Sequence, residues 1–167
     1  FYDQEELLFF QNLMSKQMIL SIMEDFYQNA FWQTPYEIIS QLPVKLYLNT
    51  SPDNFLMRVM KNRSPILERF RKHDSNPTLT NPSLESPLIY NLIGSVTEPD
   101  SILLTHDDIF EFYTELFSQG IPNIIKGELQ KAKLMILLGL SLDKWYIQLL
   151  LRLLDFGKPT IKFTTYS

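Results

Sequence analysis

The sequence predicts an α/β fold of three layers with a mainly parallel sheet. Short apolar stretches that suit strands alternate with amphipathic stretches that suit helices, a pattern typical of this class. One stretch, residues 133–138, is apolar at nearly every position, as expected of a strand buried on both faces. The chain has 167 residues, of which 45% are hydrophobic, so one domain with a substantial core is expected.

Composition and charge exclude several classes of protein. Cysteine is absent, which excludes disulfide scaffolds, thiolate zinc sites and cysteine nucleophiles. A net charge of −4 argues against a strongly basic nucleic-acid-binding protein. No apolar run reaches the roughly 18 residues that a membrane span requires. His73 and His106 are far apart in the sequence, so no metal site is expected. These features are compatible with a cytoplasmic protein.

The first 33 residues are expected to be helical, and residues 34–167 to form the α/β core of a single, incomplete domain. Asp3 suits the cap of a first helix. A further helix is indicated by an apolar stripe at spacings of three and four residues. This stripe consists of Ile19, Ile22, Met23, Phe26, Tyr27 and Ala30. Thr34 to Glu37 resembles a capping box and predicts a short helix to about Gln41.

The core is expected to contain five strands separated by turns and helices. The expected strands are residues 45–50, 66–71, 88–93, 133–138 and 160–166, and residues 101–104 are expected to form a further short extended segment. Helices are expected to start at Ser51, at the capping-box-like sequence Thr105 to Asp108, and at Pro122. A last helix with Trp145 is expected over residues 143–155. Residues 73–87 are rich in Asn, Pro, Ser and Thr, and predict a long surface loop.

Three of these strands are followed by small polar turns. The turns are Thr50-Ser51, Gly94-Ser95 and Gly139-Leu140-Ser141. The first and third are expected to open directly into helices, whose N-termini favour anions. Because ligands of parallel sheets bind beyond the carboxyl ends of the strands, the turns predict a nucleotide or phosphate crevice. The alternative is that the turns are purely structural, since any α/β fold needs small residues where strands meet helices.

Four segments resemble, in their order and spacing, landmarks of the sirtuin-like NAD-binding family. They are KLYLNTSPDNFL (45–56), PLIYNLIGS (87–95), SILLTHDD (101–108) and KLMILLGLSLDKW (133–145). The resemblance covers about residues 35–156 and is closest to the bacterial branch found in anti-phage defence. It implies a Rossmann-type sheet that binds NAD or an ADP-ribose-like nucleotide. The implied binding residues are Thr50, Ser51, Asp53, Gly94, Ser95, Gly139 and Ser141.

The sequence departs from active members of this family, which cleave the nicotinamide–ribose bond of NAD. Their Thr-Asn-x-Asp sequence corresponds here to residues 50–53, where Ser51 replaces the asparagine. Their catalytic histidine corresponds to Ile93, which cannot accept a proton. Asp53 therefore remains the only candidate catalytic residue. Its alternative role is that of a favourable acid in the first turn of a helix.

Two further features of the family have no counterpart in this sequence. A glycine-rich phosphate loop is absent, so we expect the first strand–helix unit to precede Phe1. The zinc ribbon of deacetylase-type sirtuins is absent together with cysteine, which disfavours a protein deacylase.

Three hypotheses about function remain. The first is a catalytically degenerate nucleotide-binding module of a larger bacterial protein, acting with the rest of its polypeptide or as a homo-oligomer. The second is a structural or protein-interaction module with an empty crevice. The third is an atypical NAD hydrolase. The remaining charged residues have simpler expected roles: Asp107 and Asp108 cap a helix, and the basic residues between Arg58 and Lys72 form a solvated face.

Overall fold

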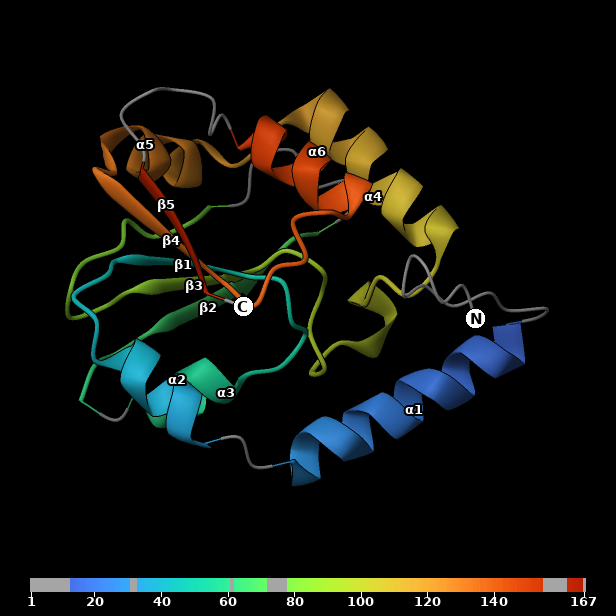
Figure 1. The fold of residues 1–167 in the computed structure, drawn as a ribbon. Coiled ribbons are helices and arrows are strands. Elements are labelled where there is room, and N and C mark those ends of the chain that lie inside the picture. The colour runs from blue at the N-terminus through green and yellow to red at the C-terminus, as the bar shows by residue number, and fades with distance from the viewer. Residues whose placement is uncertain (1–12, 31–32, 61, 72–77, 155–161, 167) are drawn as a thin grey trace.

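A computed structural model describes residues 13–30, 33–60, 62–71, 78–154 and 162–166 (Figure 1). The helices are α1 (Leu13–Asn29), α2 (Gln33–Ser40), α3 (Phe55–Val59), the 3-10 helix η1 (Pro99–Ser101), α4 (His106–Gln119), α5 (Asn123–Lys131) and α6 (Trp145–Leu153). The strands are β1 (Leu46–Asn49), β2 (Ile66–Arg69), β3 (Leu88–Asn91), β4 (Leu134–Leu138) and β5 (Lys162–Tyr166). All five expected strands are present, but Ser101 ends η1 and residues 102–104 form no strand. The helix start expected at Asp3 lies outside the described residues. None of the described helices has the length and apolar character needed to cross a membrane.

The central strand of the main sheet is β3. It lies between β1 and β2 and pairs in parallel with both. All four of its residues are buried, as expected of a strand with neighbours on both edges and layers on both faces. The strands β4 and β5 form a second parallel pair.

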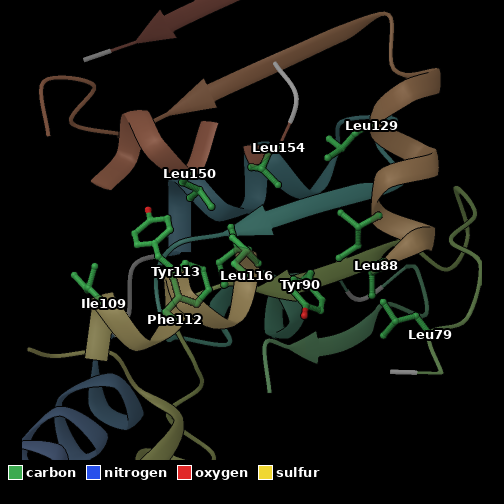
Figure 2. Packing of buried hydrophobic residues seen from close by; sticks show 12 residues of the cluster. Leu79, Leu88, Tyr90, Ile109, Phe112, Tyr113, Leu116, Leu129, Leu150 and Leu154 are labelled. Carbon is green, nitrogen blue, oxygen red and sulfur yellow. The ribbon is translucent and has the colours of Figure 1, made fainter. Parts of the chain in front are cut away.

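Helices cover both faces of the main sheet. Successive side chains of a strand point to opposite faces, so neighbouring residues of β3 pack against different helices. On one face, Leu88 and Tyr90 of β3 pack with residues of α4, α5 and α6, among them Phe112 and Leu150 (Figure 2). On the other face, Ile89 of β3 packs with Leu56 and Met60, which belong to α3 and the residue that follows it. The helix α2 also lies on this face, through Tyr36 and Ile39. The expected three-layer α/β fold with a parallel sheet is confirmed.

The expectation that residues 133–138 form a strand buried on both faces is wrong for one face. Met135 packs against the cluster around α4 and α6, and Leu137 is buried. In contrast, Leu134, Ile136 and Leu138 are 58%, 39% and 41% exposed. The apolar sequence indicates cover on both faces, whereas within the described part of the chain only one face of β4 is covered.

Three expected helix starts differ from the structure. Ser51 does not cap a helix, because residues 50–54 form a turn and α3 begins only at Phe55. Ser141 does not open a helix either, since α6 begins at Trp145 after a further turn. The helix α2 begins at Gln33, ahead of the capping box expected at Thr34. In each case the local pattern marks a turn or helix correctly but not its first residue.

The helix α1 lies across the loop that connects β3 to α4 (Figure 1). Leu20 is buried against Val96, Ile102 and Leu104 of that loop. The stripe expected on this helix is only partly correct: Ile19, Met23 and Tyr27 join the contact, but Ile22 and Phe26 are exposed. The reason is that the loop is a narrow partner and covers fewer residues than a broad core would.

Candidate functional site

The turns that follow β1 and β3 lie together at the carboxyl end of the sheet. In the parallel pairing of these strands, Asn49 stands opposite Asn91, so both strands end at the same level. The backbone amide of Val96 donates a hydrogen bond to the carbonyl of Pro52 at 2.9 Å and joins the two turns directly. The structure thus brings Thr50, Ser51 and Asp53 next to Gly94 and Ser95.

Asp53 is the centre of the first turn and is only 1% exposed. Its Oδ1 accepts the backbone amide of Phe55 at 2.8 Å, and its Oδ2 accepts the hydroxyl of Tyr36 at 3.0 Å. The same Oδ2 also accepts the hydroxyl of Ser51. Both carboxylate oxygens are therefore engaged by the protein itself. Asp53 precedes α3 rather than lying in its first turn, so its alternative role as a favourable acid in the first turn of a helix is wrong.

Two asparagines connect the strands below this turn. The Nδ2 of Asn49 donates to Oδ1 of Asn91 at 3.0 Å, and Nδ2 of Asn91 donates to the carbonyl of Asp53 at 3.3 Å. The backbone amide of Ser51 donates to Oδ1 of Asn49 at 3.0 Å. The sequence analysis missed both asparagines. The signal available was a polar amide at the end of an apolar strand, because a buried amide needs hydrogen-bonding partners.

Tyr36 of α2 is a third residue that the sequence analysis missed. Burial raises the pKa of its phenol, and the nearby charge of Asp53 raises it further. The phenol therefore keeps its proton at neutral pH and acts as a donor to Asp53. Its ring also packs edge-on against Phe55, with centroids 5.5 Å apart. Tyr36 thus connects the helical layer to the carboxyl end of the sheet.

The second turn, at Gly94 and Ser95, folds back on the segment before α4. Gly94 has a φ of 93°, and a Cβ on this residue would lie 2.1 Å from the carbonyl oxygen of Ser101. The backbone amide of Ser95 donates to the hydroxyl of Ser101 at 2.9 Å. The hydroxyl of Ser95 lies 2.9 Å from that of Thr97. This turn is therefore a close-packed loop that requires glycine at its first position.

Ile93, at the position that the resemblance assigns to a catalytic histidine, lies directly before this turn. It is partly buried and packs against the apolar cluster shared with α4 and α6. Its carbonyl accepts the backbone amide of Leu103 at 3.1 Å. The residue therefore contributes packing and a backbone contact, and offers no side-chain group for proton transfer.

The third turn, between β4 and α6, is at the same end of the molecule but is not joined to the first two. The strand β4 runs in the same direction as β1 and β3 (Figures 1 and 2). Gly139 has a φ of 66° and is exposed, as is Ser141. Across the described ranges, no hydrogen bond links either residue to the network around Asp53. The candidate site therefore has two connected turns and a separate third one.

Two of the basic residues expected on a solvated face have structural partners instead. Arg63 donates to the carbonyls of Leu84 at 2.6 Å and Val44 at 2.5 Å, which fixes the segment that leads into β1. Arg69, the last residue of β2, forms an ion pair with Glu98 in the loop after the second turn. The expectation of a solvated face is wrong for these two residues.

Comparison with family models shows which family the chain belongs to. A family model described as a SIR2-like domain matches residues 45–159, a range that contains all three turns. The chain belongs to the SIR2-like domain family. Members of this family are related to sirtuins, generally bind NAD and have a Rossmann-like fold. The parallel sheet with its helices agrees with that fold. A comparison with curated proteins finds no significant match.

Proposed function

We propose that this SIR2-like domain binds NAD or an ADP-ribose-like nucleotide at the carboxyl end of its sheet without hydrolysing it. The observation that carries the proposal is the combination of a rigid pair of turns with Ile93 in place of a catalytic histidine. The two turns, residues 50–53 and 94–95, form an ordered rim for a ligand. Among the described residues, Ile93 at the histidine position offers no side chain that could handle a proton.

The rim is ordered before any ligand arrives. Asp53, Asn49 and Asn91 hold the first turn, and the Val96 to Pro52 hydrogen bond attaches the second turn to it. A site that is ordered in advance loses less conformational entropy on binding. Turns at the carboxyl ends of parallel strands are also the usual place for ligands in such sheets. Both points favour binding over an empty crevice.

Two observations argue against hydrolysis. Ile93 has no proton acceptor, and a positioned general base contributes about 10²–10⁴-fold in rate. Asp53, the only candidate catalytic residue, is buried with both carboxylate oxygens engaged by Tyr36, Ser51 and the Phe55 amide. We therefore assign Asp53 a positioning role. Neither Ile93 nor Asp53 therefore supplies the general base that an atypical NAD hydrolase needs.

Calorimetric titration of the full parent protein with NAD and with ADP-ribose tests the binding. A matched pair of variants places an arginine in the rim (Thr50→Arg) or on the exposed surface of α4 (Ser118→Arg). We expect saturable binding that Thr50→Arg weakens at least about tenfold, a loss of roughly 1.4 kcal/mol, while Ser118→Arg binds like the wild type. No heat at millimolar ligand would instead support the interaction module with an empty crevice.

The resemblance to the bacterial branch supports a wider proposal about the parent protein. Its nucleotide-binding module would work in the cytoplasm together with other parts of the same polypeptide, as a sensor in anti-phage defence. In this setting we expect a phage to form fewer plaques on cells that carry the wild-type gene than on cells that carry the Thr50→Arg variant. Equal plaque numbers, with both proteins present at equal amounts, would argue against this role.

A further inference from the structure

An arginine lies at the carboxyl end of the sheet, in register with the two asparagines of the candidate site. Arg69 ends β2 and stands opposite Asn91 of β3, which in turn stands opposite Asn49 of β1. Two residues before these positions, Leu67 and Ile89 pack on the face that α2 and α3 cover. Because side chains alternate along a strand, Arg69 and both asparagines point to that same face. The last residues of the three strands thus form one polar row.

The protein uses the guanidinium of Arg69 only in part. The side chain is 16% exposed, and one of its terminal nitrogens pairs with the carboxylate of Glu98. Its Nε is buried and finds no hydrogen-bond acceptor among the described residues. A guanidinium binds an anion most strongly when one carboxylate or phosphate accepts from two of its nitrogens at once. The pair with Glu98 leaves this second contact unmade.

Arg63 shows how an arginine with a purely structural role is bound in the same chain. Its Nε donates to the carbonyl of Leu84 at 2.6 Å, and its Nη2 donates to the carbonyl of Val44 at 2.5 Å. Its Nη1 donates to the hydroxyl of Tyr47 at 3.2 Å. Every side-chain nitrogen of Arg63 therefore has an acceptor, whereas Arg69 keeps a buried donor free. Because a buried donor without an acceptor is costly, its presence at the carboxyl end of the sheet indicates that a ligand supplies the acceptor.

Glu98 is fixed through its backbone, while its side chain is more than half exposed. The backbone amide donates to the carbonyl of Ser95 at 2.9 Å, and the carbonyl of Glu98 accepts the hydroxyl of Ser101 at 2.6 Å. Rotation of the side chain alone therefore releases the carboxylate to water and leaves the loop in place. An ion pair with such an exposed carboxylate contributes little stability. An incoming anion can thus replace Glu98 at Arg69 at small cost.

We propose that Arg69 binds a phosphate group at the carboxyl end of the sheet, and that the carboxylate of Glu98 occupies this position until the ligand arrives. The phosphate accepts from Nε and a terminal nitrogen of Arg69 together, and Glu98 turns to water. Phosphate oxygens suit the planar fork of an arginine. Where the phosphate belongs to a nucleotide, this inference rests on the proposed function. A free phosphate compound is the other source.

Calorimetric titration of the full parent protein with ADP-ribose and, separately, with inorganic pyrophosphate tests this proposal. We expect Arg69→Met to weaken binding at least about tenfold, because a charged contact through two nitrogens is lost. We expect Glu98→Gln to tighten binding about two- to fivefold, because the competing carboxylate is removed. The matched controls Arg71→Met and Asp100→Asn make the same changes of charge at exposed positions, and neither should alter the affinity.

The opposite directions of the two effects separate ligand binding from a structural role. If the ion pair only held the loop, Glu98→Gln would weaken binding or leave it unchanged, and this result would overturn the proposal. If Arg69→Met does not fold, Arg69→Lys keeps the charge and removes the two-nitrogen fork, and it should also weaken binding.

The two compounds distinguish this proposal from the proposed function. Binding of pyrophosphate alone, with the expected effects of both variants, would support phosphate binding at Arg69 and contradict nucleotide binding. Binding of ADP-ribose that neither variant changes would support the proposed function and contradict the role of Arg69. Heat from neither compound at millimolar concentration would contradict both.

Discussion

Gly94 is the residue whose replacement the structure opposes most strongly. Its positive φ suits glycine, and the carbonyl of Ser101 occupies the space that a Cβ would need. We predict that Gly94→Ala lowers the free energy of unfolding by about 3 kcal/mol or more, combining backbone strain with a displaced loop. Urea unfolding measures the change.

The control for this variant is Gly127→Ala in α5. A Cβ at Gly127 meets nothing within 4 Å, and alanine is a better helix former by about 1 kcal/mol. This variant is therefore expected to be slightly more stable than the wild type. If both alanine variants changed stability equally, the close approach of Ser101 to Gly94 would be wrong.

Asp53 provides the second prediction at the scale of a residue. In Asp53→Asn one carboxylate oxygen becomes an NH₂ group, which cannot accept a hydrogen bond. Either the Phe55 amide, bound to Oδ1, or the hydroxyls of Tyr36 and Ser51, bound to Oδ2, then lose their acceptor. Each buried donor left without an acceptor costs about 1–3 kcal/mol. We predict that Asp53→Asn lowers the free energy of unfolding by about 2–4 kcal/mol, measured by urea unfolding.

The exposed Asp100 serves as the matched control, and Asp100→Asn should unfold like the wild type. Wild-type stability of Asp53→Asn, combined with lost nucleotide binding, would contradict the positioning role of Asp53. That outcome would make Asp53 a direct ligand contact rather than a positioning residue.

At the scale of elements, the pair Lys16–Asp108 connects α1 to the start of α4. Lys16 Nζ lies 2.6 Å from Oδ1 of Asp108, and Oδ2 of Asp108 accepts the backbone amides of Leu104 and Thr105 at 3.0 Å. Burial alone would raise the pKa of Asp108, but the hydrogen bonds from Lys16 and Leu104 and the charge of Lys16 lower it below its usual value. A carboxyl whose pKa is lowered by folding stabilises the protein above its usual pKa. That stability is lost as the pH falls through the lowered value.

We therefore predict that part of the stability disappears as the pH falls below about 4, the usual pKa of an aspartate. The Asp108→Asn variant should be less stable than the wild type at neutral pH, and this difference should shrink at acidic pH. Urea unfolding between neutral and acidic pH measures it. Asp107→Asn, at an exposed position, is the control. A difference between Asp108→Asn and the wild type that stays constant with pH would contradict the role of the charge.

The elements also show what could be predicted from the sequence. The capping box of α4 was predicted correctly, since Thr105 and Asp108 contact each other across one helical turn. The hydrogen bonds that connect the different elements of the site were not predicted, because they join residues far apart in the sequence. Tyr36 reaches Asp53 across 17 positions, and Asn49 reaches Asn91 across 42. Local sequence patterns carry information only about residues that are close in the sequence. The exposure of Ile22 on α1 likewise could not be predicted, because it depends on which distant segment packs against the helix.

At the scale of the whole molecule, the described contacts hold the turns of the candidate site in place but add no general base to it. Helices on both faces bury β3, and β3 positions Asn91 and Gly94 at the carboxyl end of the sheet. The helix α1 lies across the adjoining loop and is held by Lys16. All of these contacts order the rim, and none of them supplies a general base at Ile93. Family membership together with this arrangement is the basis on which we propose binding without hydrolysis.

Equilibrium dialysis of the full parent protein against NAD, with mass-spectrometric quantification of NAD and nicotinamide in both compartments, tests this claim most directly. It reports binding and cleavage in the same sample. We predict that intact NAD accumulates in the protein compartment and that nicotinamide stays at the level of a protein-free control. Nicotinamide that rises with time, or NAD at equal concentration on both sides, would contradict the account.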